Sequence, residues 1–99
     1  MYNFQKGGTM VKGYKNKGNV YIPVEIAEGL FSNEYAVTIE LADGTYISLY
    51  ANKNLVNDFD GQYFLKVALV KDTEKRVLLP SEAFETSTRW ATVSNLKFA

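Results

Sequence analysis

The stretch YAVTIELADGTYISLY, residues 35–50, is the strongest indication of the architecture because it holds two alternating strands around a single Asp-Gly turn. Apolar side chains recur at every second position on both sides of Asp43-Gly44, which is the period of a half-buried β-strand. The stretch therefore predicts a β-hairpin. The loop length fixes its register, and a change of one residue would send every side chain to the opposite face of the sheet.

Two loop lengths fit this turn, and they bury different residues. A two-residue loop at Asp43-Gly44 would bury Ser48 and turn Ile47 and Leu49 to solvent. A three-residue loop, residues 42–44, buries Ile47 and Leu49. It also puts the glycine third, where a type I turn followed by a bulge needs a left-handed residue. Burial and turn chemistry both favour the longer loop.

The stretch LVKDTEKRVLLPSEAF, residues 69–84, predicts a second hairpin of the same kind. Val77 and Leu79 are expected to return opposite the inward residues of the preceding strand. Each return strand leads into a short connection, and Pro80 suits the first position of a single helical or 3₁₀ turn. No segment has the periodicity of a longer helix. The sequence therefore predicts an all-β domain of about 5–7 short antiparallel strands with one-turn helical connections.

The N-terminal region differs from the rest of the chain. Residues 1–9, MYNFQKGGT, contain Gly-Gly near their end and show no periodicity, so they are expected to form a flexible arm before a single domain at residues 10–99. Residues 19–26 have the β-branched composition of a strand. Pro23 predicts an edge position for that strand, because proline cannot donate a hydrogen bond to a neighbour.

This succession of strands resembles the SH3-like small β-barrels, including their Tudor and KOW relatives. The residues that carry the resemblance are EYAVTIELADGTYISLYANKNLV (34–56) and VLLPSEAFETSTRWATVSNL (77–96). It implies a closed or nearly closed barrel, in which closure removes exposed strand edges. A two-sheet β-sandwich is the alternative architecture.

Catalysis is not expected from this composition. The chain has no histidine and no cysteine, which excludes thiol nucleophiles, histidine bases and zinc sites built on either residue. Asp58 and Asp60 precede a glycine as in a cation loop, but the further ligands of a calcium loop are missing. A solvated turn between strands is the simpler interpretation. We therefore expect a protein without enzymatic activity, cofactor or metal.

The tyrosines and phenylalanines suggest a binding surface. Thirteen such residues and Trp90 are more than one small core hides easily, and clustered exposed aromatic side chains mark contact sites. In the register above, Tyr46 and Tyr50 point outward, and Phe64 would extend their patch if the two hairpins are neighbours. The expected function is protein–protein interaction or self-association through this face. Whether Trp90 belongs to the core or to the contact surface stays open.

Nucleic-acid binding is the alternative function. Lys12, Lys15 and Lys17 are interleaved with Tyr14 and Tyr21. Together with the outward Tyr46 and Tyr50 they suit phosphate contacts and base stacking. Against it stand the net charge of zero and an acidic middle, because residues 25–60 carry seven acidic side chains and one lysine. Such a region would repel phosphates.

The expected location is the cytoplasm. Met1 is followed by polar and aromatic residues, which differ from the basic and then apolar start of a signal peptide. No apolar run approaches the roughly 20 residues that cross a bilayer, so no membrane partner is expected.

Overall fold

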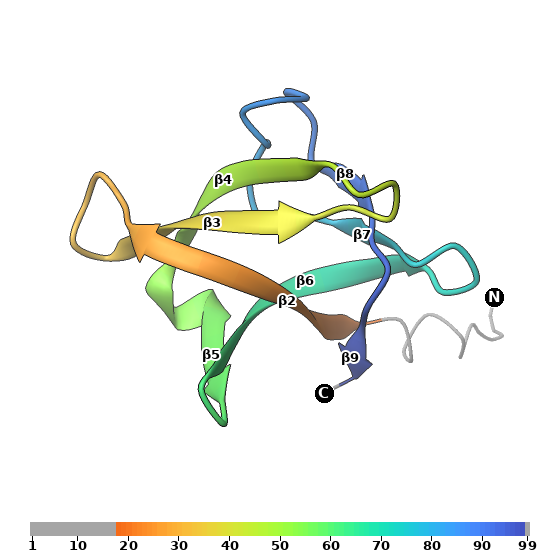
Figure 1. Ribbon diagram of the computed structural model, residues 1–99, viewed down its shortest axis with the longest axis horizontal. Coiled ribbons are helices and arrows are strands. Elements are labelled where there is room, and N and C mark those ends of the chain that lie inside the picture. Colours follow the sequence, from red (N-terminus) through yellow and green to blue (C-terminus); the bar gives the residue numbers. More distant parts are fainter. Residues whose placement is uncertain (1–17, 99) are drawn as a thin grey trace, which may run out of the picture.

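The computed structural model describes residues 18–98, which form a strongly curled antiparallel sheet that resembles a half-barrel (Figure 1). Its elements are β2 (Asn19–Glu28), β3 (Glu34–Glu40), β4 (Tyr46–Asn52), the 3₁₀ helix η1 (Lys53–Leu55), β5 (Val56–Phe59), β6 (Gln62–Lys71), β7 (Arg76–Leu78), β8 (Trp90–Thr92) and β9 (Lys97–Phe98). The prediction of an all-β protein is confirmed. The described part of the chain has eight strands, slightly more than expected.

Strand β2 joins the whole sheet. Its first half pairs with β6 and its second half pairs with β3, which gives the order β4-β3-β2-β6-β7-β8. Strand β5 pairs with β6, and β9 pairs with β2 at Val20 and Tyr21. One continuous curled sheet, and not the two-sheet sandwich, is therefore the observed architecture. The first nine residues and the predicted domain start at residue 10 lie outside the described residues.

The predicted hairpin register is confirmed. Ile39 lies opposite Ile47 and Val37 lies opposite Leu49, and all four side chains are buried. The Leu41 amide donates to the Thr45 carbonyl at 2.8 Å and closes a loop of residues 42–44. Gly44 has φ +90°, which is the left-handed conformation that the turn requires.

Replacing Gly44 should lower stability through the backbone alone. No atom lies within 4 Å of the position that a Cβ would take, so a larger side chain meets no steric clash. We expect Gly44→Val to reduce the free energy of unfolding by about 1–2 kcal/mol, because a β-branched residue disfavours positive φ. Gly44→Asn is the control, since asparagine tolerates this conformation. Equal losses for both variants in urea unfolding would contradict a conformational cause.

Asp43 stabilises the same loop in a pH-dependent way. Its Oδ1 atom accepts from the Thr45 hydroxyl at 2.7 Å and from the Thr45 amide at 3.0 Å. These bonds, the hydroxyl first, lower the pKa of Asp43 below its ordinary value of 3.8. Because the folded pKa is the lower one, this contribution to stability is complete above the unfolded pKa and is lost as the pH falls through the folded pKa.

We therefore expect the stability difference between the wild type and Asp43→Asn to be largest above pH 3.8 and to shrink in more acidic solution. Urea unfolding at a series of pH values measures this difference. Asp72→Asn, in the other predicted hairpin turn, is the control. A difference that grows as the pH is lowered would have the wrong sign.

The second hairpin also forms as predicted, but its connection differs. Leu69 lies opposite Val77, and both Val77 and Leu79 are buried. After the first hairpin the chain forms η1 as predicted, with the Asn52 side chain accepting from the Asn54 amide at 3.0 Å. The helical turn predicted at Pro80 is wrong, because residues 80–83 are irregular and the turn comes later, at residues 84–86.

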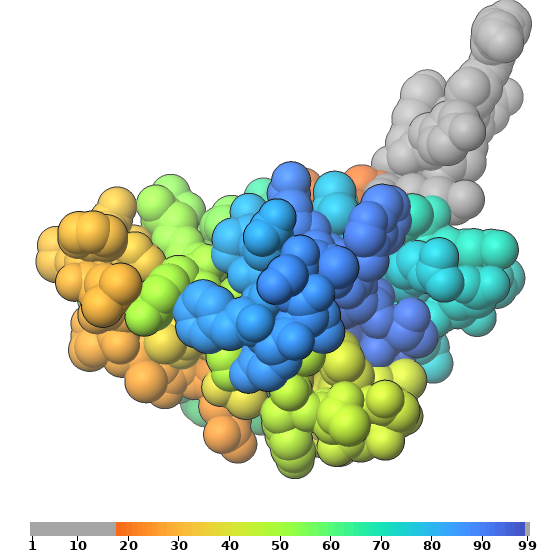
Figure 2. Space-filling model, turned by 90° about the horizontal axis from the view of Figure 1, so that it is seen from above, coloured from red at the N-terminus to blue at the C-terminus, as the bar shows by residue number. Residues whose placement is uncertain are grey.

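The reason for this difference is that residues 79–89, here called the strap, lie along the free edge of β4 (Figure 2, blue). The Phe84 amide donates to the Ser48 carbonyl at 2.8 Å. The Ser48 amide donates to Glu85 Oε1 at 2.7 Å, and the Ser81 hydroxyl donates to the Tyr50 carbonyl at 2.6 Å. These hydrogen bonds hold the strap against β4. Residues 80–83 therefore do not form a helical turn, and the strap covers a strand edge that would otherwise be open.

The prediction that β2 is an edge strand is wrong. Pro23 nevertheless lies in a short stretch of β2 that has no strand partner on one of its two sides. Strand β2 lies between β3 and β6. However, its pairing with β9 ends at Tyr21 and its pairing with β3 begins at Glu25. Proline is tolerated in this interval because no ladder bond is required on that side.

No helix within residues 18–98 is long and apolar enough to cross a membrane.

A candidate interaction surface on β2, β3 and β4

The outer face of β4 carries Tyr46 and Tyr50, the two tyrosines that the sequence analysis predicts to be binding residues. Tyr46 is exposed over 60% of its surface, whereas Tyr50 is half-buried. The Tyr50 ring packs edge-on against Phe84 of the strap, with ring centroids 5.0 Å apart. The outward direction of both tyrosines is confirmed. Tyr50 is therefore partly covered by a residue of the strap.

The two tyrosines should therefore differ in their effect on stability. Tyr46→Ser is expected to change the free energy of unfolding by less than about 1 kcal/mol, because the ring is mostly in water. Tyr50→Ser should cost about 2–3 kcal/mol, because it removes an aromatic pair and leaves space beneath Phe84. Thermal unfolding of the two single variants measures the difference. Equal losses would mean that Tyr46 is also covered.

Phe64 does not join this patch, which corrects the expected arrangement. Strands β3 and β2 lie between β4 and β6, so the two hairpins are not neighbours. Phe64 packs instead against Phe59 at 5.3 Å between centroids, and Phe59 packs against Tyr21 at 5.6 Å. The ammonium group of Lys97 lies 5.2 Å from the Phe59 centroid. These half-buried rings form a separate cluster on the sheet.

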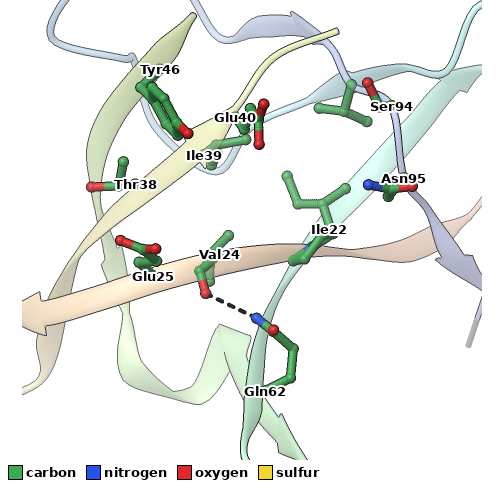
Figure 3. Close-up of a pocket in the computed structure, with 12 residues that line it drawn as sticks. Ile22, Val24, Glu25, Thr38, Ile39, Glu40, Tyr46, Gln62, Ser94 and Asn95 are labelled. Carbon is green, nitrogen blue, oxygen red and sulfur yellow. Dashed lines mark hydrogen bonds between the residues drawn. The ribbon is translucent and has the colours of Figure 1, made fainter. Parts of the chain in front are cut away.

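Beside Tyr46 the surface opens into a hollow of about 370 Å³ between β2 and β3 (Figure 3). We call it the β2–β3 hollow. It is lined by Ile22, Pro23, Val24, Glu25, Thr38, Ile39, Glu40, Tyr46, Gln62, Val93, Ser94 and Asn95. It forms because β2 and β3 are paired from Glu25↔Thr38 to Glu28↔Tyr35 but not at residues 22–24 of β2 and 39–40 of β3, where the two strands separate. The bridge between Leu41 and Val93 brings residues 93–95 to its far side.

The β2–β3 hollow combines an apolar base with an acidic rim. Ile22, Val24 and Ile39 belong to the buried core. Glu25 from β2 and Glu40 from β3 are exposed, and the close-up shows both carboxylates beside the hollow (Figure 3). Its lining contains no lysine or arginine. The Gln62 side-chain amide nitrogen donates to the Val24 carbonyl at 3.3 Å and to the Tyr63 carbonyl at 3.1 Å.

The distribution of charge adds to this acidic character. Residues 18–98 hold all eleven acidic side chains and seven of the eleven basic ones, a net charge of −4. The other four basic residues are Lys6, Lys12, Lys15 and Lys17. Lys12, Tyr14, Lys15 and Lys17 were the candidate nucleic-acid residues, and they lie outside the described part of the chain.

Trp90, which the sequence left unassigned, is a surface residue exposed over 54% of its area. It lines a second, shallower hollow with Leu41, Asp43 and Arg76. Its strand neighbour Ala91 is buried, so the indole lies on the outer side of β8. One signal for this was present in the sequence, since the small apolar residue Ala91 suits the inward position of a short strand.

The described residues offer little for chemistry at a metal. Within residues 18–98 no three acidic side chains are placed to hold an ion. Asp58 Oδ1 accepts from the Gly61 amide at 2.8 Å, and Asp60 and Gly61 both have positive φ. This geometry is that of a tight turn between β5 and β6.

Comparison with known proteins assigns no family to this fold: no family model matches the chain, and no curated protein or solved structure is significantly similar to it.

Proposed function

We propose that this protein is a non-catalytic binding module that recognises a basic segment of a partner protein through Tyr46 and the adjoining β2–β3 hollow. The observation that carries the proposal is a mostly exposed tyrosine at the rim of a hollow with an apolar base and two carboxylates. Tyrosine combines a large apolar body with a polar tip, which suits a surface that must remain in water when unbound.

The architecture supports this proposal. We propose that the half-barrel belongs to the SH3-like type, because a short 3₁₀ connection follows β4 and the strap closes the edge of the same strand. A rigid small barrel presents surface side chains in fixed positions, which lowers the entropy lost on binding. The ionisable side chains that line the hollow are Glu25, Glu40 and Tyr46, and we propose that they serve binding and not catalysis.

A comparative pulldown tests the proposed function. The full chain, Tyr46→Ser and Tyr63→Ser would each be immobilised and exposed to the same cell extract after nuclease treatment. Tyr63 is the matched control because it is an exposed tyrosine that does not line the hollow. A protein partner should bind the wild type and Tyr63→Ser and be lost from Tyr46→Ser. Retention by all three would contradict a role for this surface.

The partner in the proposed binding role could also be a second copy of this protein. Light scattering of the purified wild type and Tyr46→Ser separates it from recognition of a different protein. A dimer that dissociates in Tyr46→Ser would identify a second copy as the partner.

Nucleic acid is a weaker candidate for this surface, because Glu25 and Glu40 would face the phosphates. We expect no measurable binding of single- or double-stranded nucleic acid near physiological salt. Fluorescence anisotropy with labelled oligonucleotides is the measurement, with the Lys12→Ala, Lys15→Ala, Lys17→Ala triple variant as control. Micromolar binding that falls steeply with salt and disappears in the triple variant would favour nucleic acid instead.

A further inference from the structure

We infer that the β2–β3 hollow is a socket for one lysine or arginine side chain of the partner segment. This inference rests on the proposed function and specifies the chemistry of the group that is recognised. Four properties of the described residues lead to it: the size of the hollow, its apolar base, its charge and its aromatic rim.

The size of the hollow fits a single long side chain. At about 370 Å³ it lies near the lower end of the range for ligand-binding pockets. It is bounded by β2 on one side, β3 on another and residues 93–95 on the far side (Figure 3). These segments are fixed by strand pairing and by the Leu41–Val93 bridge, so the hollow exists before a ligand arrives.

The base of the hollow suits an alkyl chain. Ile22, Val24 and Ile39 present apolar atoms there and are themselves packed in the core. Lysine and arginine bury their methylene stems against apolar surface while their charged ends stay near water. A short acidic or amide side chain would leave this apolar base without contact.

The charge of the rim selects a cation. Glu25 and Glu40 come from the two strands that bound the hollow, and no lysine or arginine of the lining neutralises them. A basic side chain could be approached by both carboxylates, and a hydrogen bond between two charged groups is stronger than one between neutral groups. The exposed ring of Tyr46 adds an aromatic face, which attracts cations within about 6 Å of its centroid.

Matched peptides test the socket directly. The probes are acetyl-Gly-Ser-Lys-Ser-Gly-amide and the same peptide with norleucine in place of lysine, which keeps the stem and removes the charge. Each is titrated into the ¹⁵N-labelled full chain. We expect the lysine peptide to shift the amide resonances of residues 38–40 and 94–95 saturably. The norleucine peptide should bind at least 10-fold more weakly. Equal binding of both peptides, or shifts confined to other parts of the sheet, would overturn the inference.

Variants of the rim provide the second arm of the test. Glu25→Gln and Glu40→Gln should each weaken the binding of the lysine peptide several-fold, and the double variant should abolish saturable binding of this peptide. Glu82→Gln is the matched control, because Glu82 is exposed on the strap and does not line the hollow. The amide spectrum of each variant verifies its fold. An equal loss in Glu82→Gln would indicate a general charge effect and would contradict a specific socket.

Lys12, Lys15 and Lys17 are competing occupants, since they are basic and belong to the same chain. The Lys12→Ala, Lys15→Ala, Lys17→Ala triple variant of the full chain distinguishes this case. An affinity for the lysine peptide that rises 10-fold or more would assign the socket to the chain's own lysines and overturn the assignment to a partner. An unchanged affinity supports the partner.

The same variants separate a failure of this inference from a failure of the proposed function. If Tyr46→Ser loses the partner in the pulldown while the Glu25→Gln, Glu40→Gln double variant retains it, the surface binds a protein without a cation socket. If neither variant loses the partner, both proposals fail.

Discussion

Leu49→Ala is expected to lower the free energy of unfolding by about 2–5 kcal/mol. Leu49 is fully buried in β4 and lies opposite Val37, which is also fully buried. Truncation removes apolar contacts and leaves a cavity that the surrounding strands can fill only in part, because both hairpin strands are held by their register. Urea unfolding monitored by the fluorescence of Trp90 would measure the loss.

Ser48→Ala is the matched control for this prediction. Ser48 is the next residue along the same strand, but its side chain is on the other face, and its contacts with the strap use only its backbone atoms. The change should cost less than about 0.5 kcal/mol. If Ser48→Ala were the more costly of the two, the hairpin in solution would have a register shifted by one residue.

The hairpin could be derived from the sequence because its determinants are local. The Asp-Gly turn allowed two loop lengths, and only one of them buried Ile47 and Leu49. That choice also predicted the positive φ of Gly44 and the outward direction of Tyr46. Turn geometry and a period of two are both readable within a few residues.

The placement of Tyr50 and Phe64 could not be derived in the same way, because it depends on which strands become neighbours. Strand β2 pairs with both hairpins and so separates Phe64 from the tyrosines. Tyr50 faces outward as the register requires, but Phe84 of the strap packs on its ring. A residue more than thirty positions away in the chain has no local signal at Tyr50.

The β2–β3 hollow has a similar origin. Its lining comes from β2, from β3 and from residues 93–95, which are distant in the chain. The sequence held one sign of it, the proline at position 23, which indicated a side of β2 without a strand partner. The other residues that line the hollow could not be predicted, because they come together only when the sheet curls.

The strap covers the edge of β4, and a substitution that displaces the strap should strongly lower the stability of the protein. Ala83 is buried, its amide donates to the Thr88 carbonyl at 2.9 Å, and its carbonyl accepts from the Ser87 amide at 2.8 Å. These bonds shape the strap so that Phe84 and Glu85 reach the backbone of Ser48. A methyl group fits this position, and a larger or charged side chain would have to displace the strap.

Ala83→Asp is therefore expected to cost on the order of 3–5 kcal/mol, because it buries a carboxylate without a charged partner. The Ala83→Asp variant relieves part of this cost by moving the strap away, which opens the edge of β4. An open strand edge is a template for pairing with another chain, so the variant should also self-associate in a concentration-dependent way. Urea unfolding measures the stability, and light scattering measures the association.

Glu82→Ala is the control, because Glu82 precedes Ala83 on the strap and is exposed. It should remain close to the wild type in both measurements. An Ala83→Asp protein that unfolds at the wild-type urea concentration would show that the strap does not stabilise the fold. An uncovered edge of β4 would have backbone hydrogen-bonding groups available for a second strand. Loss of stability without association would therefore show that this edge remains covered in the Ala83→Asp variant.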